Sequence, residues 1–559
     1  MFNLKKPGFA TAIVLIFLTV ASILLLIIYE VLANYRNNEV RMRLESQLEV
    51  DALNTLNVGI GMIRSKSAGI LGFDITFSPN TPSWFNSEFL NKLNNDWKQF
   101  VTKNVKANSV YKVISMTGNE NYSIDPSVIS EISNYKSERG LDSIEIYAFN
   151  MNKLVLFLVS RVVKNGNSTY AYGIVSSKLL NQYVYFTNKE KLENGQTIYF
   201  KSGEIIDGPL RTHDYININN AGGNPTFLST IEILGIKDRN GNVVQPNNYS
   251  NYVNLLGNPP YKILTQGDIN SLDFNAIKSQ YQSSINSLVD TYNNVKNNPN
   301  KLSGLKFTDD ITVSFNHGQG NSNYDIIISH KKANETVEYK INWEPSGPPL
   351  ARIRKQGGGQ PEEFVFNFNG IIYSTGNMTI GGPKGSSGPT NLSTYNGNYT
   401  LFSEKSVYIE DRIIPYKTYQ KFFSTSEGNI VDIDKLKQIK GFVTSNETSA
   451  LNIVAINDVV INKKLRNMKL FSSIFVFDGS FRVEGYNSGD PTGQLFVFGS
   501  IMQNVRGPVG MFDPSTGQTV TGYYKTYSYD TRIITGAYQP YGTPTKSETI
   551  RLFVLGVVK

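Results

Sequence analysis

The side chains able to support catalysis or metal binding are few in this sequence. It has no cysteine and only three histidines, His213, His317 and His330, which excludes cysteine nucleophiles, disulfide frameworks and cysteine-based zinc sites. Asp309 and Asp310 are adjacent, but a calcium site needs several more oxygen ligands at fixed spacing. We expect His213 to be a surface residue, and we expect no catalytic residue, no metal and no cofactor.

Phosphate and nucleic-acid chemistry are not indicated either. The stretch HGQGNSNYD lacks the third glycine of a dinucleotide-binding loop. The stretch KQGGGQP lacks the Gly-Lys-Ser/Thr of a phosphate-binding loop. The net charge of +8 is scattered without a basic stripe, so we expect no nucleic acid as a partner. Carboxylates do not recur at matching offsets, which makes a carbohydrate-active enzyme the least favoured alternative. We expect the protein not to be an enzyme.

The elements that would position a functional surface begin with an apolar segment. The chain is uncharged from Phe9 to Tyr29, and Lys5 and Lys6 precede it. As a helix it would span roughly 30 Å, the thickness of a bilayer core. The charge asymmetry predicts a single-pass inner-membrane protein with a cytoplasmic N terminus and the rest of the chain outside. The predicted anchor residues are Phe9, Ile13, Leu18, Leu24, Ile28 and Tyr29. A cleaved secretory signal ending in VLA, residues 31–33, is the alternative.

The start of this segment has a family likeness. A short basic leader ending in Gly8, then Phe9 and an unbroken apolar helix, resembles the N terminus of type IV prepilins and their pseudopilin relatives. The resemblance implies cleavage after Gly8 by a prepilin peptidase, N-methylation of Phe9, and assembly with other pilin-like subunits. The fifth residue after the cut, glutamate in major pilins, is Ile13 here, as in PilX-like pilus assembly proteins and tip-type minor pilins.

An amphipathic pattern follows the apolar segment and predicts that the helix continues to about residue 67. The spacing is helical, with charged and amide residues on the other faces. An independent second helix remains the alternative. The apolar stripe consists of Val40, Leu44, Leu48, Ala52, Leu56 and Ile60.

Residues 68–195 read as an α+β module. SEFLNKLNNDWKQFVTKN (87–104) has the spacing of one helix, and IEIYAFN and LVLFLVSRVV read as strands. Asn165-Gly166 is the two-residue signal of a β-hairpin. Nothing in this module indicates catalysis.

A nine-residue pattern recurs further along: an apolar strand, a bend at the fifth position, and a second strand with apolar seventh and ninth positions. Such a repeat predicts a parallel β-solenoid, and a β-sandwich is the alternative. The segments at 199–227 and 496–533 also resemble the ends of a poorly characterised extracellular domain that follows PilX-like N termini. The copies begin at Leu210, Ile372, Leu401, Ile453, Phe475 and Leu495.

The predicted fold class is therefore mainly β, with a long N-terminal transmembrane and amphipathic helix, an α+β module, and a β-solenoid with a large insertion. The expected boundaries are 1–8 leader, 9–67 helix, 68–195 module, 196–232 first coil, 233–360 insertion, 361–510 solenoid and 511–559 C-terminal extension.

The predicted function is a minor or tip pilin-like subunit of a type IV pilus or related filament, displayed at the cell surface for assembly initiation or adhesion. Its expected partners are the prepilin peptidase, other pilin-like subunits and the membrane. The alternative is a permanently membrane-tethered protein that binds a surface glycan, for which the Tyr-rich TGYYKTYSYD segment offers stacking surfaces, or another protein.

Overall fold

The structure is a computed structural model, and its described residues form two compact units. Unit 1 is built from the described parts of Met1–Lys66, Asp74–Val175 and Arg551–Lys559, and unit 2 from those of Ser176–Ile550. The structure describes residues 30, 36, 39, 41–63, 78–116, 126–152, 155–179, 182–192, 194–270, 274–318, 324–332, 335–343, 350–357, 359–381, 391–425, 430–535, 540, 542, 543 and 545–558.

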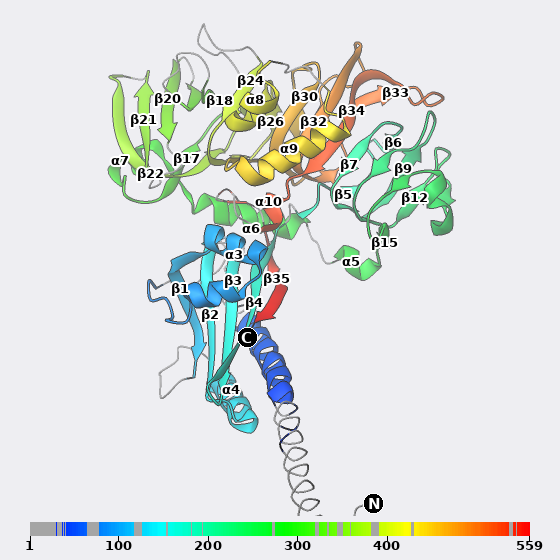
Figure 1. Cartoon of the computed structure of the whole chain (residues 1–559). Helices are drawn as coiled ribbons and strands as arrows, with labels where there is room; N and C mark the ends of the chain where they lie inside the picture. Colours follow the sequence, from blue (N-terminus) through cyan, green and yellow to red (C-terminus); the bar gives the residue numbers. More distant parts are fainter. Residues whose placement is uncertain are drawn as a thin grey trace, which may run out of the picture. The chain divides into compact units, whose positions relative to one another are not determined.

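Unit 1 contains a five-stranded sheet with the order β1-β2-β3-β4-β35 (Figure 1). Strand β1 pairs antiparallel with β2, and β2 with β3. The strands are β1 (Lys106–Ser115), β2 (Ser143–Asn152), β3 (Val155–Lys164), β4 (Asn167–Leu179) and β35 (Thr545–Val558). Its helices include α2 (Ser87–Lys92), α3 (Asn95–Asn104) and α4 (Pro126–Arg139).

Two local predictions in unit 1 can be compared with the structure. The Asn-Gly hairpin is confirmed: Asn165 and Gly166 both have positive φ, 51° and 75°, and they connect β3 to β4. The helical structure expected over 87–104 is confirmed, although the chain forms two helices there, α2 and α3. The Asn94 side chain accepts a hydrogen bond from the backbone N–H of Trp97, which starts a new helix at that point.

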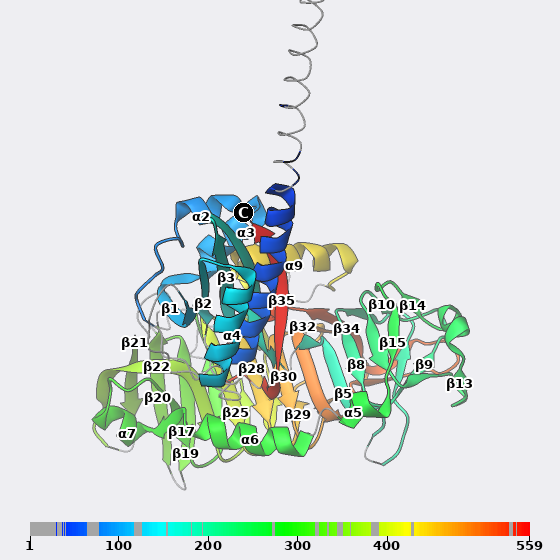
Figure 2. The ribbon, with the colours of Figure 1, turned by 90° about the horizontal axis from the view of Figure 1, so that it is seen from below.

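An N-terminal helix, described at residues 30, 36, 39 and 41–63, packs along this sheet within unit 1 (Figure 2). The helix lies close to the sheet at Gly59, where an added Cβ would lie 2.7 Å from Ile146 Cγ2 and 3.4 Å from Leu158 Cδ2. Glycine is therefore required for this contact between the helix and strands β2 and β3. The stripe residues buried in the structure are Leu48, Ala52, Leu56 and Ile60.

The predicted membrane location is corrected. Across the part of the chain that the structure describes, none of the helices is both long and apolar enough to cross a membrane. The anchor positions predicted from the sequence lie outside the described residues: Phe9, Ile13, Leu18, Leu24, Ile28 and Tyr29.

Unit 2 consists mainly of a 26-stranded mixed sheet and a four-stranded sheet of order β13-β12-β9-β6. Its earlier strands are β5 (Tyr185–Lys189), β6 (Tyr199–Lys201), β7 (Ile205–Asp207), β8 (Leu210–Thr212), β9 (Tyr215–Asn219), β10 (Thr226–Phe227), β11 (Ile231–Ile233), β12 (Gly235–Lys237), β13 (Val243–Val244), β14 (Asn254–Leu255), β15 (Tyr261–Ile263), β16 (Val289–Thr291), β17 (Ser303–Phe307), β18 (Ile311–Phe315), β19 (Ile326–Lys332), β20 (Glu335–Trp343) and β21 (Leu350–Gln356).

The later strands carry most of the parallel pairing. They are β22 (Glu362–Ser374), β23 (Met378–Ile380), β24 (Leu392–Tyr395), β25 (Asn398–Ser403), β26 (Val407–Ile409), β27 (Arg412–Pro415), β28 (Ala450–Ala455), β29 (Val459–Ile461), β30 (Met468–Val476), β31 (Phe481–Val483), β32 (Pro491–Val505), β33 (Gly510–Phe512) and β34 (Thr519–Tyr529). The helices are η3 (Pro246–Asn251), α5 (Gln266–Asn270), α6 (Phe274–Asn286), α7 (Tyr292–Asn297), α8 (Tyr416–Phe422), α9 (Ile433–Asn446) and α10 (Arg532–Thr535).

A parallel ladder runs through this sheet in the order β17-β22-β25-β28-β30-β32-β5-β8-β11-β15. Because strands pair in register, one line of buried apolar side chains crosses it, and alternate residues form a second line on the other face. The first line includes Ile372, Leu401, Ile453, Ile474 and Ile501.

Helices cover two parts of the sheet. Helix α6 packs its apolar face on the second line of side chains, which includes Tyr373, Phe402 and Phe475. Helix α9 packs with α8 over Phe471 of β30 and Phe496 and Phe498 of β32, and it is the yellow helix over these strands in Figure 1. Burial on both faces explains why β30 is buried at every position.

The predicted fold class is corrected for the body of the chain as well. A solenoid built in chain order would stack the first coil, at Leu210, on the coil at Ile372. In the structure β8 instead pairs with β5 and β11, and β5 pairs with β32, while β22 pairs with β17 and β25. The same mixed sheet also contains antiparallel pairs from β18 to β22. Apolar alternation specifies which face is buried, but it does not specify which strand is the neighbour.

Candidate functional site

Unit 2 contains a groove of about 570 Å³ with charged side chains in its walls. We call it the β6–β34 groove, because Lys201 of β6 and Lys525 of β34 line it together with Glu204. Its aromatic lining includes Tyr199 and Phe512, whose ring centroids lie 6.1 Å apart in an edge-to-face arrangement. A volume of this size is within the range of small-molecule sites.

Two buried ion pairs lie at this groove and directly behind it. Lys525 Nζ lies 2.9 Å from Glu204 Oε1, and Arg506 Nη1 lies 2.6 Å from Glu190 Oε2. The Arg506 guanidinium also lies 3.9 Å from the centroid of the Phe200 ring. Because charges are costly to bury unless they are paired, this arrangement is a built feature of the fold.

Lys201 is the cation of this cluster that the ion pairs do not neutralise. Its side chain is 6% exposed, and its ammonium donates a hydrogen bond to Ser202 O at 3.3 Å. Burial lowers the pKa of Lys201 below its ordinary value, and nearby Glu204 opposes that shift. The amino group of Lys201 is therefore largely removed from water in the groove wall.

Lys525 is held in a similar state. Burial lowers its pKa to about 8, with Glu204 acting in the opposite direction and Arg506 adding to the decrease. Its ammonium also donates a hydrogen bond to Tyr199 O at 3.3 Å. At neutral pH the side chain stays mostly protonated, since its pKa is still above 7.

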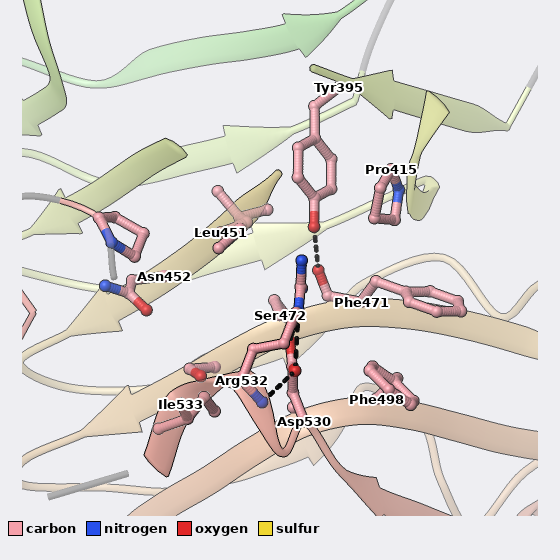
Figure 3. Close-up of a pocket in the computed structure, with 14 residues that line it drawn as sticks. Tyr395, Pro415, Leu451, Asn452, Phe471, Ser472, Phe498, Asp530, Arg532 and Ile533 are labelled. Atoms are coloured by element: carbon pink, nitrogen blue, oxygen red, sulfur yellow. Dashed lines mark hydrogen bonds and ion pairs between the residues drawn. The ribbon is translucent and has the colours of Figure 1, made fainter. Parts of the chain in front are cut away.

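A second, smaller cavity surrounds Arg532 and Asp530 (Figure 3). The two side chains form a buried ion pair at 2.6 Å, and Arg532 also donates hydrogen bonds to Glu447 O and Ser449 O. The cavity volume is about 20 Å³, enough for about one water molecule. This cluster joins the end of α9 to the segment after β34, and it is too small to be a ligand site.

The surface position predicted for His213 is wrong. Its side chain is 7% exposed, and it contacts Arg211 Nε at 3.3 Å and Asn188 Oδ1 at 3.2 Å. Burial, with a smaller effect of the Arg211 charge, lowers the pKa of His213 to about 4. The imidazole is therefore neutral at pH 7 and forms part of the packing.

The two adjacent aspartates are used in structural contacts. Asp310 Oδ1 accepts a hydrogen bond from the Asn377 backbone N–H at 2.7 Å, and Asp309 Oδ2 lies 3.5 Å from His330 Nε2. Among the described residues, no cluster of histidine and carboxylate side chains has the composition of a metal site. The predicted processing residues, Gly8 and Phe9, lie outside the described residues.

The groove was not found by sequence reasoning, although both of its chain segments were noticed. TGYYKTYSYD was considered for its tyrosines, but Tyr523, Tyr527 and Tyr529 are each 2% exposed and cannot stack on a ligand from solution. The sequence feature that could have indicated the groove is a lysine within an otherwise uncharged strand. Lys201 follows Tyr199-Phe200, and Lys525 lies between tyrosines and a threonine.

Comparisons with known proteins give little further identification. No family model matches this sequence, and no curated protein is detectably related to it. The predicted PilX-like character therefore stays a prediction. Among solved structures the chain is similar to the crystal structure of the competence-associated pilin ComZ from Thermus thermophilus, with a TM-score of 0.28 and 10% identity over 74% of this chain and 83% of the other. A likeness at this level carries neither fold nor function to the present chain.

Proposed function

We propose that the protein is a pilin-like subunit, of the minor or tip kind, that enters a type IV pilus or related filament through its N-terminal helix. The observation that carries the proposal is the packing of this helix on the antiparallel sheet of unit 1. Residues 48–63 supply the buried stripe of the unit's own core. Residues 41–47 contain no fully buried side chain, and Met42 is 62% exposed. The same helix thus offers a face to other subunits.

The helix is fixed in unit 1 by polar contacts as well as by apolar packing. Asp51 is completely buried, and its Oδ1 accepts hydrogen bonds from Tyr135 Oη at 2.7 Å and Gln47 Nε2 at 3.1 Å. Arg139 Nε lies 3.4 Å from the same oxygen. These contacts hold the helix in one register on its unit, which a subunit needs if force or position is transmitted along the helix.

The sequence before the described helix supports the same role. The leader ending in Gly8 predicts cleavage by a prepilin peptidase, and the stretch that follows is apolar. Ile13 stands where a bulk pilin has glutamate, and we therefore assign a minor or tip position with other pilin-like subunits as partners. Unit 2, which contains most of the chain, would supply the specific surface of that subunit for assembly initiation or adhesion.

N-terminal analysis of the native protein tests this proposal. We expect the mature chain to begin at N-methylated Phe9, and we expect Gly8→Leu to leave the leader in place. Gly61→Leu is the matched control, because a Cβ added at Gly61 meets no atom within 4 Å, and this substitution should not affect processing. An intact Met1, or a chain beginning at Asn34, contradicts the proposal.

A further inference from the structure

The buried charges around the β6–β34 groove do not balance. Three cations, Lys201, Arg506 and Lys525, lie with two carboxylates, Glu190 and Glu204. Arg506 is paired with Glu190, and Lys525 is paired with Glu204. Lys201 Nζ donates a hydrogen bond to Ser202 O at 3.3 Å, and among the described residues it forms no ion pair of its own. The nearby carboxylate, Glu204, acts on the pKa of Lys201 but is already paired with Lys525. Two lysines thus share one carboxylate, and this excess of buried positive charge indicates a place for an anion supplied from outside.

The other residues that line the groove indicate which uncharged part a ligand would have. Tyr199, Tyr486 and Phe512 are half-buried and line the groove, and Met511, at 44% exposed, is beside them. Tyr199 and Phe512 are arranged edge to face, so their exposed surfaces meet at an angle rather than forming one flat platform. Aromatic surfaces of this kind pack well on the C–H faces of a pyranose ring. The groove therefore combines one lysine, Lys201, that can bind an anion with aromatic side chains that can pack against a sugar ring.

We propose that the β6–β34 groove binds an acidic saccharide, with the carboxylate of a uronic acid unit against Lys201 and the sugar ring against Tyr199 and Phe512. A phosphate monoester is disfavoured, because its charge of about −2 would need more than one unpaired cation. A neutral sugar is disfavoured, because it would leave Lys201 without an anion. This assignment goes beyond the proposed function and holds whether or not the chain enters a filament.

Calorimetric titration of the full chain at pH 7 tests the assignment. The probe is trigalacturonic acid, and the comparison ligands are the neutral galactose trimer, inorganic phosphate and a short peptide with a free C-terminal carboxylate. We expect the uronate trimer to bind at least tenfold more tightly than each comparison ligand. Equal or tighter binding of any comparison ligand, or no uronate binding at millimolar concentration, overturns the proposal.

Two variants test whether the ligand binds in the groove. Lys201→Met keeps most of the length of the side chain and removes its charge, and we expect at least tenfold weaker uronate binding. Phe512→Ala removes a half-buried ring and should weaken binding severalfold with the charge intact. Lys417→Met is the matched control, since Lys417 is an exposed lysine of α8 outside the groove, and it should bind as the unchanged protein does.

Folding of the key variant is checked by its melting temperature. Because Lys201 is buried without a carboxylate partner, Lys201→Met should melt at the same temperature or higher than the parent chain. Unchanged uronate affinity in a folded Lys201→Met protein overturns the proposal. If Lys201→Met melts lower, Phe512→Ala decides: unchanged affinity in that variant also overturns it.

Discussion

Arg506 Nη1 lies 2.6 Å from Glu190 Oε2, and the two side chains are 2% and 0% exposed. The pair joins residues 316 positions apart in the sequence. Thr187 Oγ1 and Tyr185 Oη donate further hydrogen bonds to the Glu190 carboxylate, and Arg506 also donates to Tyr199 O at 3.1 Å. The pair therefore fixes the parallel contact of β5 with β32, which brings the two walls of the β6–β34 groove together.

Removing one member of this pair should destabilise unit 2 strongly. Arg506→Met leaves the Glu190 carboxylate buried without its cation, and we expect a loss of about 3–5 kcal/mol in the free energy of unfolding. Urea denaturation of the full chain, followed by circular dichroism, measures it. Arg352→Met is the control, because Arg352 is 63% exposed in its pair with Glu363 and should cost about 1 kcal/mol or less. Equal losses in the two variants would contradict this role.

The packing of the N-terminal helix predicts opposite effects for two neighbouring glycines. Gly59→Ala places a methyl group 2.7 Å from Ile146 Cγ2, and such overpacking costs about 1–3 kcal/mol. Gly61→Ala meets no atom within 4 Å and should stabilise the helix by roughly 0.5–1 kcal/mol. Hydrogen exchange of residues 48–63 should accelerate in Gly59→Ala and slow in Gly61→Ala. The same direction in both would show that the helix does not pack as described.

His213 should make unit 2 less stable in mild acid. Its pKa is lowered to about 4 in the folded chain, from an ordinary value of about 6.5. Between these values the unfolded chain binds more protons, so stability is complete above about pH 6.5 and decreases as the pH falls towards 4, by up to about 3 kcal/mol. The groups facing the ring are Arg211, Asn188 and Phe186.

The check is a comparison of denaturation curves at pH 7.5 and pH 5. His213→Gln keeps a polar side chain and removes the titration, so its loss of stability between the two pH values should be smaller than that of the parent chain. An identical loss in the two proteins would assign the acid sensitivity to other groups.

Local patterns in the sequence predicted local structure well. The Asn165-Gly166 turn was predictable from two residues, and the buried face of the N-terminal helix from its spacing. Three of the six repeat copies pair at matching positions, Ile372 with Leu401 and Leu401 with Ile453, but the copy at Phe475 is shifted by one residue, since Ile453 pairs with Ile474. These features depend on backbone conformation and on which side of an element is apolar.

The sheet order and the groove could not be predicted in the same way. Many strands of unit 2 carry the same apolar alternation, so their sequences do not distinguish β32 from β22 as a neighbour of the early strands. The groove depends on that choice, because Lys201 and Lys525 meet only when β34 pairs with β7. Capping was also missed: Asn94 interrupts an otherwise helical spacing by binding the backbone of α3.

The most direct test of the proposed function is the content of purified filaments. Filaments sheared from cells that produce this protein should contain the chain at low stoichiometry, as measured by quantitative mass spectrometry, with an N-terminal peptide that begins at Phe9. The Gly8→Leu chain should be missing from the same fraction, and the Gly61→Leu chain should be present. Filaments that never contain the wild-type chain, although the cells produce it, would contradict its assignment as a pilin-like subunit.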